Sequence, residues 1–414
     1  MRKVFNFLIL WLFFVPNTFF LVKPIRWKTR KIPVVIFLNS NRYRSDIDSL
    51  IKLDQFNFFE FRPKGLNLLN LIFDPKGDVR SNKFVSIPRT MRFRCLASIL
   101  KVFSEFFVIR IVSCSFYYGQ DALLEAISEV SGIKFICLYK EFIKDDAVKA
   151  DTIGRFKKQK YRFRGALLMC ANDTIRDIVV EAGVCKQSQT AVVGSPRFDD
   201  LLSNRTKVSA SKHIVLFSFH HASGLIQLKN SRFFCEEGEG FADLFFLVHK
   251  EFLRSCVKFQ DVKFTIKLKW GGEWFDRIKE IQRNEFPGEI FQNLEISICK
   301  PAQDLINDAS TVVAFNSTTI FEAMAVGIWP IVPMYSADIK RNFDRHVYFH
   351  KILKNLDVCH SERSFRSKLE AACTGTRIND FEKSSAALSL FAESYLGGYV
   401  APRLSRDEIG RLMK

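Results

Sequence analysis

Residues 311–333, TVVAFNSTTIFEAMAVGIWPIVP, constrain the fold of this chain more than any other stretch. An apolar run leads to a polar turn at Asn316 and Ser317, and then to an expected helix over 318–326, which Gly327 ends before a second apolar run. Two buried strands joined by one capped helix make a β-α-β unit, in which the strands run parallel. The stretch therefore predicts an α/β protein with a parallel sheet.

The turn that begins this helix has two interpretations. A helix N-terminus presents unpaired backbone N–H groups and a partial positive charge, so with the hydroxyls of Ser317 and Thr318 it suits a phosphate. Thr319 and Glu322 equally fit the T-x-x-E capping box, in which the side chains only satisfy the helix end. Residue types alone leave phosphate binding and capping equally open.

Apolar runs of strand length alternate with amphipathic segments along most of the chain, which is typical of doubly wound parallel sheets. Strands are expected within 33–43, 68–73, 106–114, 133–139, 165–171, 190–201, 213–224, 262–270 and 294–299. Helices are expected near 46–53, 94–107, 121–132, 172–183, 240–257, 274–283, 362–373 and 380–395. For the helix at 172–183, Asn172 or Asp173 is the expected cap and Gly183 the expected stop.

A chain of 414 residues is long for a single core, so two domains are expected. The polar, unpatterned stretch 202–212 is the predicted linker. Ligands of open α/β sheets bind at the carboxyl ends of the strands, so two Rossmann-like doubly wound domains are expected to face a central cleft. The predicted divisions are an apolar and basic membrane-associating segment at 1–31, Rossmann-like domains at 32–205 and 206–375, and a helical tail at 376–414.

The N-terminal residues 4–22 are nearly all apolar, although Pro16 and two polar neighbours interrupt them. The stretch is just long enough to span a bilayer as one helix. Lys and Arg flank it on both sides, which favours an anionic leaflet and the cytoplasmic side. We therefore expect the protein at the cytoplasmic face of the inner (cell) membrane, peripheral or held by a single N-terminal anchor. An apolar helix packed on the domain is the alternative.

The chain has 62 Lys and Arg against 44 Asp and Glu, a formal net charge of +18. Such an excess favours an anionic partner: nucleic acid, an acidic membrane surface or a phosphorylated substrate. Ten Cys include no C-x-x-C pair, which indicates a reducing compartment and argues against a disulfide framework or a zinc site.

The order of VVGSPRFDDL (192–201), a new strand, IKLKW (266–270) and the 311–333 stretch resembles the C-terminal half of bacterial GT-B glycosyltransferases. Within that group it is similar to surface- and capsule-carbohydrate enzymes and to the CDP-glycerol glycerophosphotransferase group. The resemblance covers about residues 130–335, and NSTTxxEAMxxGxxPIxP is its specific core.

The resemblance implies a donor site in the second Rossmann-like domain. The turn Asn316-Ser317-Thr318 matches the one that binds the phosphates of a nucleotide-activated donor, and Glu322 matches the acid that binds ribose hydroxyls. Lys267 matches the lysine of a K-x-H-P motif that contacts donor phosphate. A solvated strand face is the alternative for this lysine.

Other residues match the family pattern less closely. Lys269 and Trp270 stand in place of the His and Pro of that motif, which leaves a catalytic role there open. His220, in the loop after the first strand of the second domain, and Arg197, in the GSPRFD turn, are further donor-binding candidates. A structural loop histidine and an internal contact between Arg197 and Asp199 are the alternatives.

An inverting transfer needs a base on the acceptor side to deprotonate the attacking hydroxyl. In the glycerophosphotransferase-like group a W-H-G-T turn supplies a His after the strand matching 133–139, whereas this chain has LYKEFIKDD there. Glu141 is the first candidate for the base and Asp121 the second; both also fit ordinary acids at helix ends. No metal site and no resident cofactor are expected, because helix dipoles and basic side chains meet the charge of the leaving nucleotide.

The expected protein is thus a membrane-associated GT-B transferase. It would move a sugar or a polyol phosphate from a nucleotide-sugar or CDP/CMP-linked donor to a growing surface glycan or a lipid-linked acceptor. The alternatives are a nucleotide-sugar epimerase on the same fold and a non-catalytic basic protein with a degenerate GT-B body that binds membrane or nucleic acid. Nucleic acid is not the expected partner, because the cations are spread along the sequence without a dense arm.

Overall fold

A computed structural model describes residues 22–26, 28, 32–38, 44–61, 97–98, 100–102, 104–117, 119–144, 146–203, 212–219, 242–268, 272–335, 349–377, 380–398 and 405–414. These residues form two compact units. Unit 1 comprises the described residues of 1–142, 153–199 and 402–414, and unit 2 those of 143–152 and 200–401. Each unit contains one largely parallel sheet with helices, so the prediction of two Rossmann-like α/β domains is confirmed.

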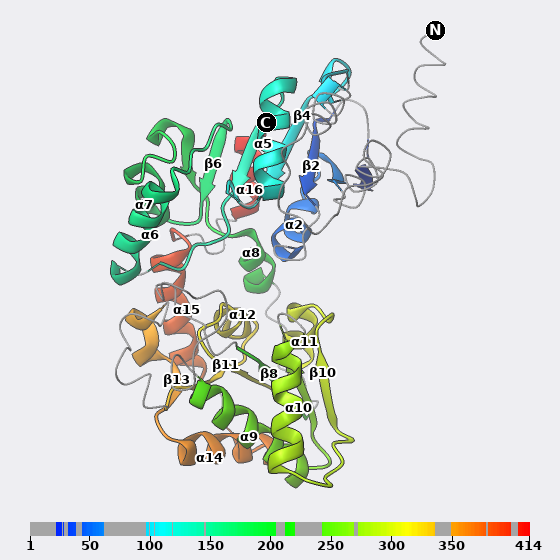
Figure 1. Ribbon diagram of the computed structural model, residues 1–414, viewed down its shortest axis with the longest axis vertical. Helices are drawn as coiled ribbons and strands as arrows, with labels where there is room; N and C mark the ends of the chain where they lie inside the picture. The colour runs from blue at the N-terminus through cyan, green and yellow to red at the C-terminus, as the bar shows by residue number, and fades with distance from the viewer. Residues whose placement is uncertain are drawn as a thin grey trace. The chain divides into compact units, whose positions relative to one another are not determined.

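Unit 1 is built on a seven-stranded sheet of order β1-β3-β2-β4-β5-β6-β7 (Figure 1). Strands β2 to β7 run parallel, and β1 is antiparallel at one edge. The strands are Val22–Arg26 (β1), Val34–Leu38 (β2), Asn57–Phe61 (β3), Ile109–Ser113 (β4), Lys134–Leu138 (β5), Leu167–Cys170 (β6) and Thr190–Val192 (β7). Five of them, β2 and β4 to β7, lie within predicted strand ranges, whereas β1 and β3 were not predicted. The strand predicted at 68–73 lies outside the described residues.

Helices cover this sheet on both faces. They are α2 (Arg44–Ile51), α5 (Gly119–Ser131), α7 (Asp173–Glu181) and α16 (Ser405–Met413). Two further helices, α6 (Asp146–Gln159) and α8 (Pro196–Ser203), are divided between the units: residues 153–159 and 196–199 belong to unit 1, and residues 146–152 and 200–203 belong to unit 2. The predicted cap of α7 is confirmed, because the Asn172 side chain accepts a hydrogen bond from the backbone N–H of Ile175 at 2.9 Å. The predicted stop is also present, since Gly183 has a left-handed φ of 67°. Helix α6 was not predicted, because it carries Gly154 and many polar residues.

The C-terminal helix α16 belongs to unit 1, although α15 (Phe381–Tyr395), the helix before it, belongs to unit 2. The carboxylate of Asp199 caps α16 by accepting hydrogen bonds from the backbone N–H groups of Ser405 (3.0 Å) and Arg406 (2.7 Å). Ile409 and Met413 are buried in the same core as α2 and the strands. Residues 376–414, predicted as one helical tail, are therefore divided between the two units.

The basic residues that follow the apolar N-terminal stretch lie at the edge of the unit 1 sheet. Strand β1 pairs with β3. Arg26 and Lys28 both form an ion pair with Asp54, and the Lys28 Nζ distance is 2.6 Å. The expected contact of the flanking cations with an anionic leaflet stays a prediction. The part of the chain that the structure describes contains no helix long and apolar enough to cross a membrane, and residues 4–21 lie outside it.

Unit 2 is built on a six-stranded, fully parallel sheet of order β10-β9-β8-β11-β12-β13. The strands are His213–Phe217 (β8), Lys263–Lys267 (β9), Leu294–Ser297 (β10), Thr311–Ala314 (β11), Ile331–Pro333 (β12) and Asp357–Cys359 (β13). The β-α-β unit predicted at 311–333 is confirmed as β11, α12 (Thr319–Ala325) and β12. All of α12 is buried, so this unit forms the centre of the domain.

The helices of unit 2 form two groups. Helix α9 (Ala242–Lys258) packs against α10 (Glu273–Glu285) and α14 (Glu362–Thr374), whereas α12 packs against α11 (Ala302–Asp308) and α15. Right-handed crossovers place the helices between β8, β9 and β10 on the opposite face from the helix between β11 and β12. The sheet is therefore doubly wound, as predicted.

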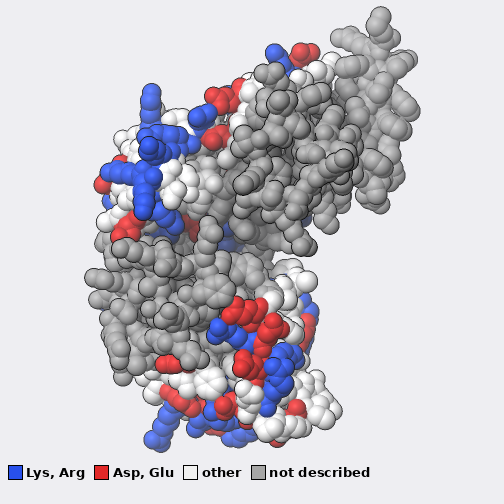
Figure 2. All heavy atoms as spheres, in the orientation of Figure 1, with Lys and Arg blue, Asp and Glu red and all other residues white. Residues whose placement is uncertain are grey.

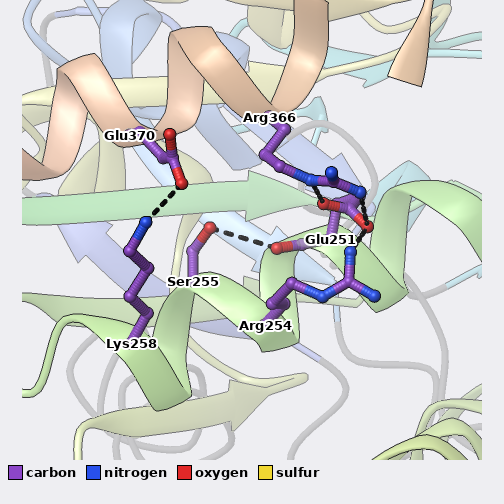
Figure 3. A pocket seen from close by; sticks show the side chains of 6 residues that line it. All are labelled: Glu251, Arg254, Ser255, Lys258, Arg366 and Glu370. Carbon is purple, nitrogen blue, oxygen red and sulfur yellow. Dashed lines mark hydrogen bonds and ion pairs between the residues drawn. The ribbon is translucent and has the colours of Figure 1, made fainter. Parts of the chain in front are cut away.

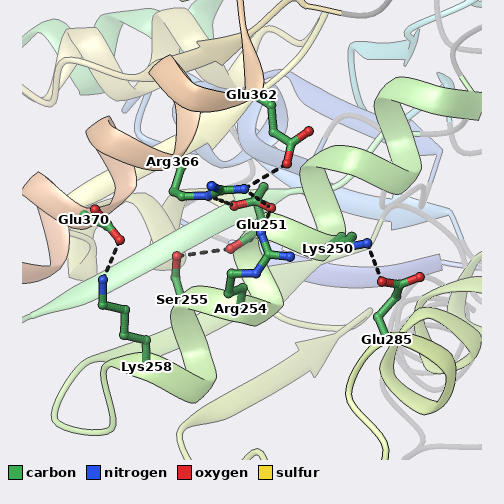
Figure 4. A network of polar contacts seen from close by, with 9 residues as sticks. All are labelled: Lys250, Glu251, Arg254, Ser255, Lys258, Glu285, Glu362, Arg366 and Glu370. Carbon is green, nitrogen blue, oxygen red and sulfur yellow. Dashed lines mark hydrogen bonds and ion pairs between the residues drawn. The ribbon is translucent and has the colours of Figure 1, made fainter.

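A network of ion pairs joins α9 to α14 (Figures 3 and 4). The Glu251 side chain is only 1% exposed and accepts from Arg366 through both carboxylate oxygens, at 2.6 and 3.0 Å, and also from Arg254. Burial by itself raises the pKa of Glu251, but the Arg366 and Arg254 guanidiniums outweigh it and hold the pKa below its usual value. The outer pair of Lys258 and Glu370, at 2.6 Å, is much more exposed.

Replacing Glu251 with Gln should lower the free energy of unfolding of unit 2 by roughly 1–2 kcal/mol, because a buried carboxylate loses two guanidinium partners that are themselves partly exposed. Lys258→Gln, which removes an exposed partner on the same helix, should change it by less than about 1 kcal/mol. Chemical denaturation followed by circular dichroism measures both. Equal losses in the two variants would show that the buried pair is no stronger than the exposed one.

Candidate functional site

The strand order of unit 2 identifies one position on its sheet where ligands of such folds bind. Strand β8 is the first of the unit; β9 and β10 extend the sheet to one side of it, and β11, β12 and β13 extend it to the other. This is the order of dinucleotide-binding domains, in which ligands lie beyond the carboxyl ends of the two strands where the winding reverses. The register pairs Ala314 with Phe217, and Phe217 with Lys267, near that edge. The turns after β8, β9 and β11 therefore emerge at the same edge of the sheet.

The turn after β11 has a specific and partly strained shape. Asn316 has a left-handed φ of 50°, which Asn adopts more readily than most residues. The Ser317 Oγ accepts hydrogen bonds from the backbone N–H (3.3 Å) and the hydroxyl (2.8 Å) of Thr319. The Thr318 hydroxyl donates to Glu322 Oε1 at 3.0 Å, and Glu322 is buried.

The capping box of Thr319 and Glu322, one of the two interpretations of this turn, is not formed. Thr318 is the N-cap residue, its backbone is helical, and its side chain makes no capping hydrogen bond. Glu322 instead accepts from the Thr318 hydroxyl one turn earlier. A carboxylate is thus held in the interior beside two hydroxyl-bearing residues at the carboxyl edge of β11, which is an arrangement that can accept hydrogen bonds from a polyol.

Lys267 ends β9 at this edge. Its Nζ donates to the backbone carbonyls of Leu268 and Ile298, each at 2.7 Å, and burial lowers its pKa. The fully solvated strand face considered for Lys267 is therefore wrong, since the side chain is half-buried and tied to the strand ends. His220, Lys269 and Trp270 lie outside the described residues.

A buried histidine that the sequence did not single out holds the turn after β8. The Ser218 Oγ lies 2.9 Å from Nε2 of His249 and accepts a hydrogen bond from the Trp274 indole N–H at 2.7 Å. The His249 Nδ1 lies 2.7 Å from the Phe245 carbonyl oxygen, so Nδ1 carries the proton. Nε2 is therefore the acceptor, and the Ser218 hydroxyl donates to it.

These contacts join three separate segments at one sheet edge. Ser218 follows β8, His249 lies on α9, and Trp274 lies in the first turn of α10. The ring of Phe219, the next residue after Ser218, packs on Phe315 at 4.9 Å between centroids. Because Phe315 directly precedes the turn after β11, this ring contact packs the turn after β8 against the turn after β11.

Unit 1 places both candidate bases at the carboxyl edge of its own sheet. Asp121 lies in the first turn of α5, is buried, and accepts a hydrogen bond from the Ser113 hydroxyl at the end of β4. Glu141 follows the neighbouring strand β5, is 39% exposed and lies 3.5 Å from Lys140 Nζ. Adjacent strands therefore bring these two carboxylates to the same edge.

Arg197 lies at the same edge of unit 1, in a contact that differs from the expected one. Its guanidinium binds Asp46 in a bidentate manner, with Nη2 to Oδ2 at 2.6 Å and Nε to Oδ1 at 3.2 Å. Ser195 also donates to Asp46, at 3.1 Å. Asp199, the alternative partner considered for Arg197, caps α16 through the backbone N–H groups of Ser405 and Arg406.

Two features of these sites were missed in the sequence for different reasons. Asp46, which lies about 150 residues before Arg197 in the sequence, is its buried partner. No local signal marks His249, which lies within an ordinary amphipathic helix. Among the described ranges, no group of three His, Cys, Asp or Glu side chains is placed to hold a metal ion.

No family model matches the sequence, and no curated protein matches it. Solved structures with a similar fold include a putative UDP-N-acetylglucosamine 2-epimerase from Listeria monocytogenes, with 10% identity, a TM-score of 0.52 and coverage of 92% of this chain and 96% of that one. A variant of the wall teichoic acid polymerase TagF has 12% identity, a TM-score of 0.50 and coverage of 93% and 88%. A glycosyltransferase from Rickettsia africae has 12% identity, a TM-score of 0.48 and coverage of 92% and 98%. The first two likenesses show a shared fold over nearly the whole chain.

His249 should make the stability of unit 2 fall in acid. Burial lowers its pKa to about 4, against about 6.5 in an unfolded chain, so the unfolded state binds more protons between these values. Unfolding free energy should therefore be constant above about pH 6.5 and fall as the pH drops towards 4, by on the order of 3 kcal/mol. Denaturant melts of wild type and His249→Gln across this range measure the difference. If the unfolding free energy of the wild type changes with pH in parallel with that of the variant, a buried, neutral His249 is contradicted.

Proposed function

We propose that the chain is a transferase that moves a sugar, or a polyol phosphate, from a nucleotide-activated donor to a glycan acceptor. The observation that carries this proposal is the turn Asn316-Ser317-Thr318 with the buried Glu322, which lies at the winding reversal of a sheet with dinucleotide-binding strand order. The fold shared with the Listeria epimerase and with TagF supports it, since their names describe a UDP-sugar enzyme and a cell-wall polymerase. Surface or capsule polysaccharide is the acceptor class that we propose.

The donor would bind unit 2 through several contacts of different chemistry. The hydroxyls of Ser317 and Thr318 and the amide of Asn316 would receive the donor phosphates, and the positive end of α12 would favour their charge. The Glu322 carboxylate would accept hydrogen bonds from the ribose hydroxyls. Lys267 brings a cation to the same edge, and its two carbonyl contacts hold its position. His220 stays a proposed donor contact of unit 2, and Arg197, which belongs to unit 1 and binds Asp46, stays a proposed donor contact from that unit.

The acceptor would bind unit 1, where Asp121 and Glu141 are the proposed bases. Either carboxylate can take the proton of the attacking hydroxyl. Asp121 is buried and oriented by Ser113, whereas Glu141 is more exposed and close to a lysine, so the two differ in environment. We propose that the charge of the leaving nucleotide is met by basic side chains and the helix terminus, without a metal ion or a resident cofactor.

Epimerisation of a nucleotide sugar is the second candidate, and one observation favours it. The Listeria protein named as an epimerase has a TM-score of 0.52, as high as that of the polymerase. The same donor site serves both reactions. A product with inverted sugar stereochemistry that forms in the absence of any acceptor would identify the epimerase.

A nucleotide screen tests the donor site directly. One of UDP, GDP, CMP and CDP, or their sugar conjugates, should raise the melting temperature by several degrees, because a ligand at 100 times its Kd adds about 2.7 kcal/mol. Glu322→Gln should weaken that nucleotide roughly 10- to 100-fold, since a hydrogen bond to a charged group contributes about 1.5–3 kcal/mol. Each protein is compared with its own ligand-free melt.

Glu295→Gln is the matched control for that screen, because Glu295 lies on the edge strand β10 and pairs with the exposed Lys300. It should leave the nucleotide response unchanged. If no nucleotide stabilises the wild-type protein, the proposed function is wrong. If the nucleotide stabilises Glu322→Gln as well as the control, the assignment of Glu322 is wrong.

Turnover with the identified donor separates the two candidate bases. Asp121→Asn or Glu141→Gln, whichever removes the base, should lower kcat by about 10²- to 10⁴-fold without changing nucleotide affinity. Lys140→Gln, next to Glu141, controls for a change of local charge. Activity within tenfold of wild type in both acid variants would exclude both residues as the base.

A further inference from the structure

Six cations lie close together in the sequence from Arg155 to Arg164, RFKKQKYRFR, which contains no acidic residue. We call these cations the basic strip; they are Arg155, Lys157, Lys158, Lys160, Arg162 and Arg164, and all six are exposed. The strip comprises the end of α6 and the loop that leads into β6. Figure 2 shows Lys and Arg gathered on the part of unit 1 where α6 and α7 lie. The expectation that the cations are spread without a dense group is therefore wrong for this region.

The basic strip is almost free of neutralising partners. Within the described residues, its one ion pair joins Arg164 to Glu129 at 3.5 Å, and both side chains are more than half exposed. The Arg162 guanidinium donates to the Tyr161 carbonyl oxygen, which does not cancel its charge. The buried carboxylates of Glu251 and Asp46 differ from the strip, because each is paired with at least one arginine. A group of unmatched like charges repels itself, and an anionic partner removes that repulsion.

The backbone beneath the basic strip is firmly held. The side chains of Phe156 and Phe163 are buried under it. Glu125 accepts hydrogen bonds from the backbone N–H groups of Arg164 (2.6 Å) and Gly165 (3.1 Å). A side chain at Gly165 would meet the Phe163 ring at 2.4 Å, so the loop packs tightly. The strip therefore presents its charges from a fixed scaffold.

We infer that the basic strip is a docking surface for an anionic lipid bilayer. The strip offers charge without exposed ring faces: Phe156 and Phe163 are buried, and Tyr161 stacks on Tyr117 at 5.1 Å. Single-stranded nucleic acid is usually bound with aromatic stacking as well as charge, so these rings do not suit it. The same sequence also carries the apolar run 4–22, which favours a lipid partner. Bilayer headgroups require only diffuse positive charge, at about 1 kcal/mol per cation.

The strip lies away from the proposed acceptor residues of unit 1. Its loop leads into the amino end of β6, where Ala166 bonds to Phe135 near the start of β5. Asp121 and Glu141 follow the carboxyl ends of β4 and β5. Because the strands are parallel, these are opposite edges of the sheet, so a bilayer at the strip leaves the carboxyl edge accessible.

Vesicle binding by the full chain tests this inference. The wild-type protein should bind vesicles of phosphatidylglycerol and phosphatidylcholine more tightly than vesicles of phosphatidylcholine alone, and high salt should remove the difference. The triple variant Lys157→Gln, Lys158→Gln, Lys160→Gln should lose about fivefold in partitioning per cation, on the order of 100-fold in total. These three lysines are exposed and form no ion pair with a described residue, so the variant should keep its fold, which circular dichroism checks.

The control variant removes the same charge from unit 2, through Lys263→Gln, Arg283→Gln and Lys354→Gln, all of which are exposed. It should bind anionic vesicles nearly as well as wild type. The inference is overturned if the wild type shows no preference for anionic vesicles, or if the two triple variants lose binding equally. It is also overturned if a single-stranded RNA binds the wild type more tightly than the vesicles do and the strip variant alone loses that binding. None of these outcomes depends on nucleotide binding by unit 2.

Discussion

The shape of the turns at the carboxyl edge of the unit 2 sheet depends on the hydrogen bonds of the neutral His249 side chain. Its two ring nitrogens have different partners, the Phe245 carbonyl oxygen and the Ser218 hydroxyl, and this difference sets the direction of every proton in the group. Trp274 completes the arrangement from a third segment. Because a protonated ring has no lone pair for Ser218, the turn after β8 keeps this shape only while the histidine is uncharged. The adjacent ring of Phe219 extends the support to the turn after β11.

This protein contains buried charged side chains that are paired and exposed ones that are almost unpaired. The buried acids Glu251 and Asp46 have cationic partners: Glu251 is matched by two guanidiniums, and Asp46 by Arg197 and also by the Ser195 hydroxyl. Removing water from an unmatched carboxylate is costly, so these pairs are requirements of the fold. The basic strip, at the end of α6 and in the loop that leads into β6, is the reverse, because its cations remain in water and almost unpaired. A solvated charge costs little in the isolated protein, and it is available to an anionic surface.

The sequence predicted most strands of both sheets, because the buried strands of parallel sheets are short apolar runs between polar turns. Prediction from the sequence failed where apolar runs and polar turns are not clearly separated. Helix α6 carries Gly154 and a run of cations, and β3 lies in a stretch where apolar residues continue without a clear period. The turn at Asn316 was predicted, yet the capping pair of Thr319 and Glu322 was not formed. Whether a hydroxyl caps its own helix or binds a neighbouring side chain depends on packing beyond the motif.

The sequence by itself determined the fold class, the β-α-β unit at 311–333 and the cap of α7, since each of these depends on residues within one or two turns of each other. Only the tertiary structure decided the strand order, the return of α16 to unit 1, and the partners of Arg197, Glu251 and His249. These contacts join residues that are far apart in the sequence, and their energies arise from burial, which no local pattern reports. The exposure of the basic strip was decided in the same way. The sequence shows six cations within ten residues, but only the packing of Phe156 and Phe163 beneath them turns all six to the solvent.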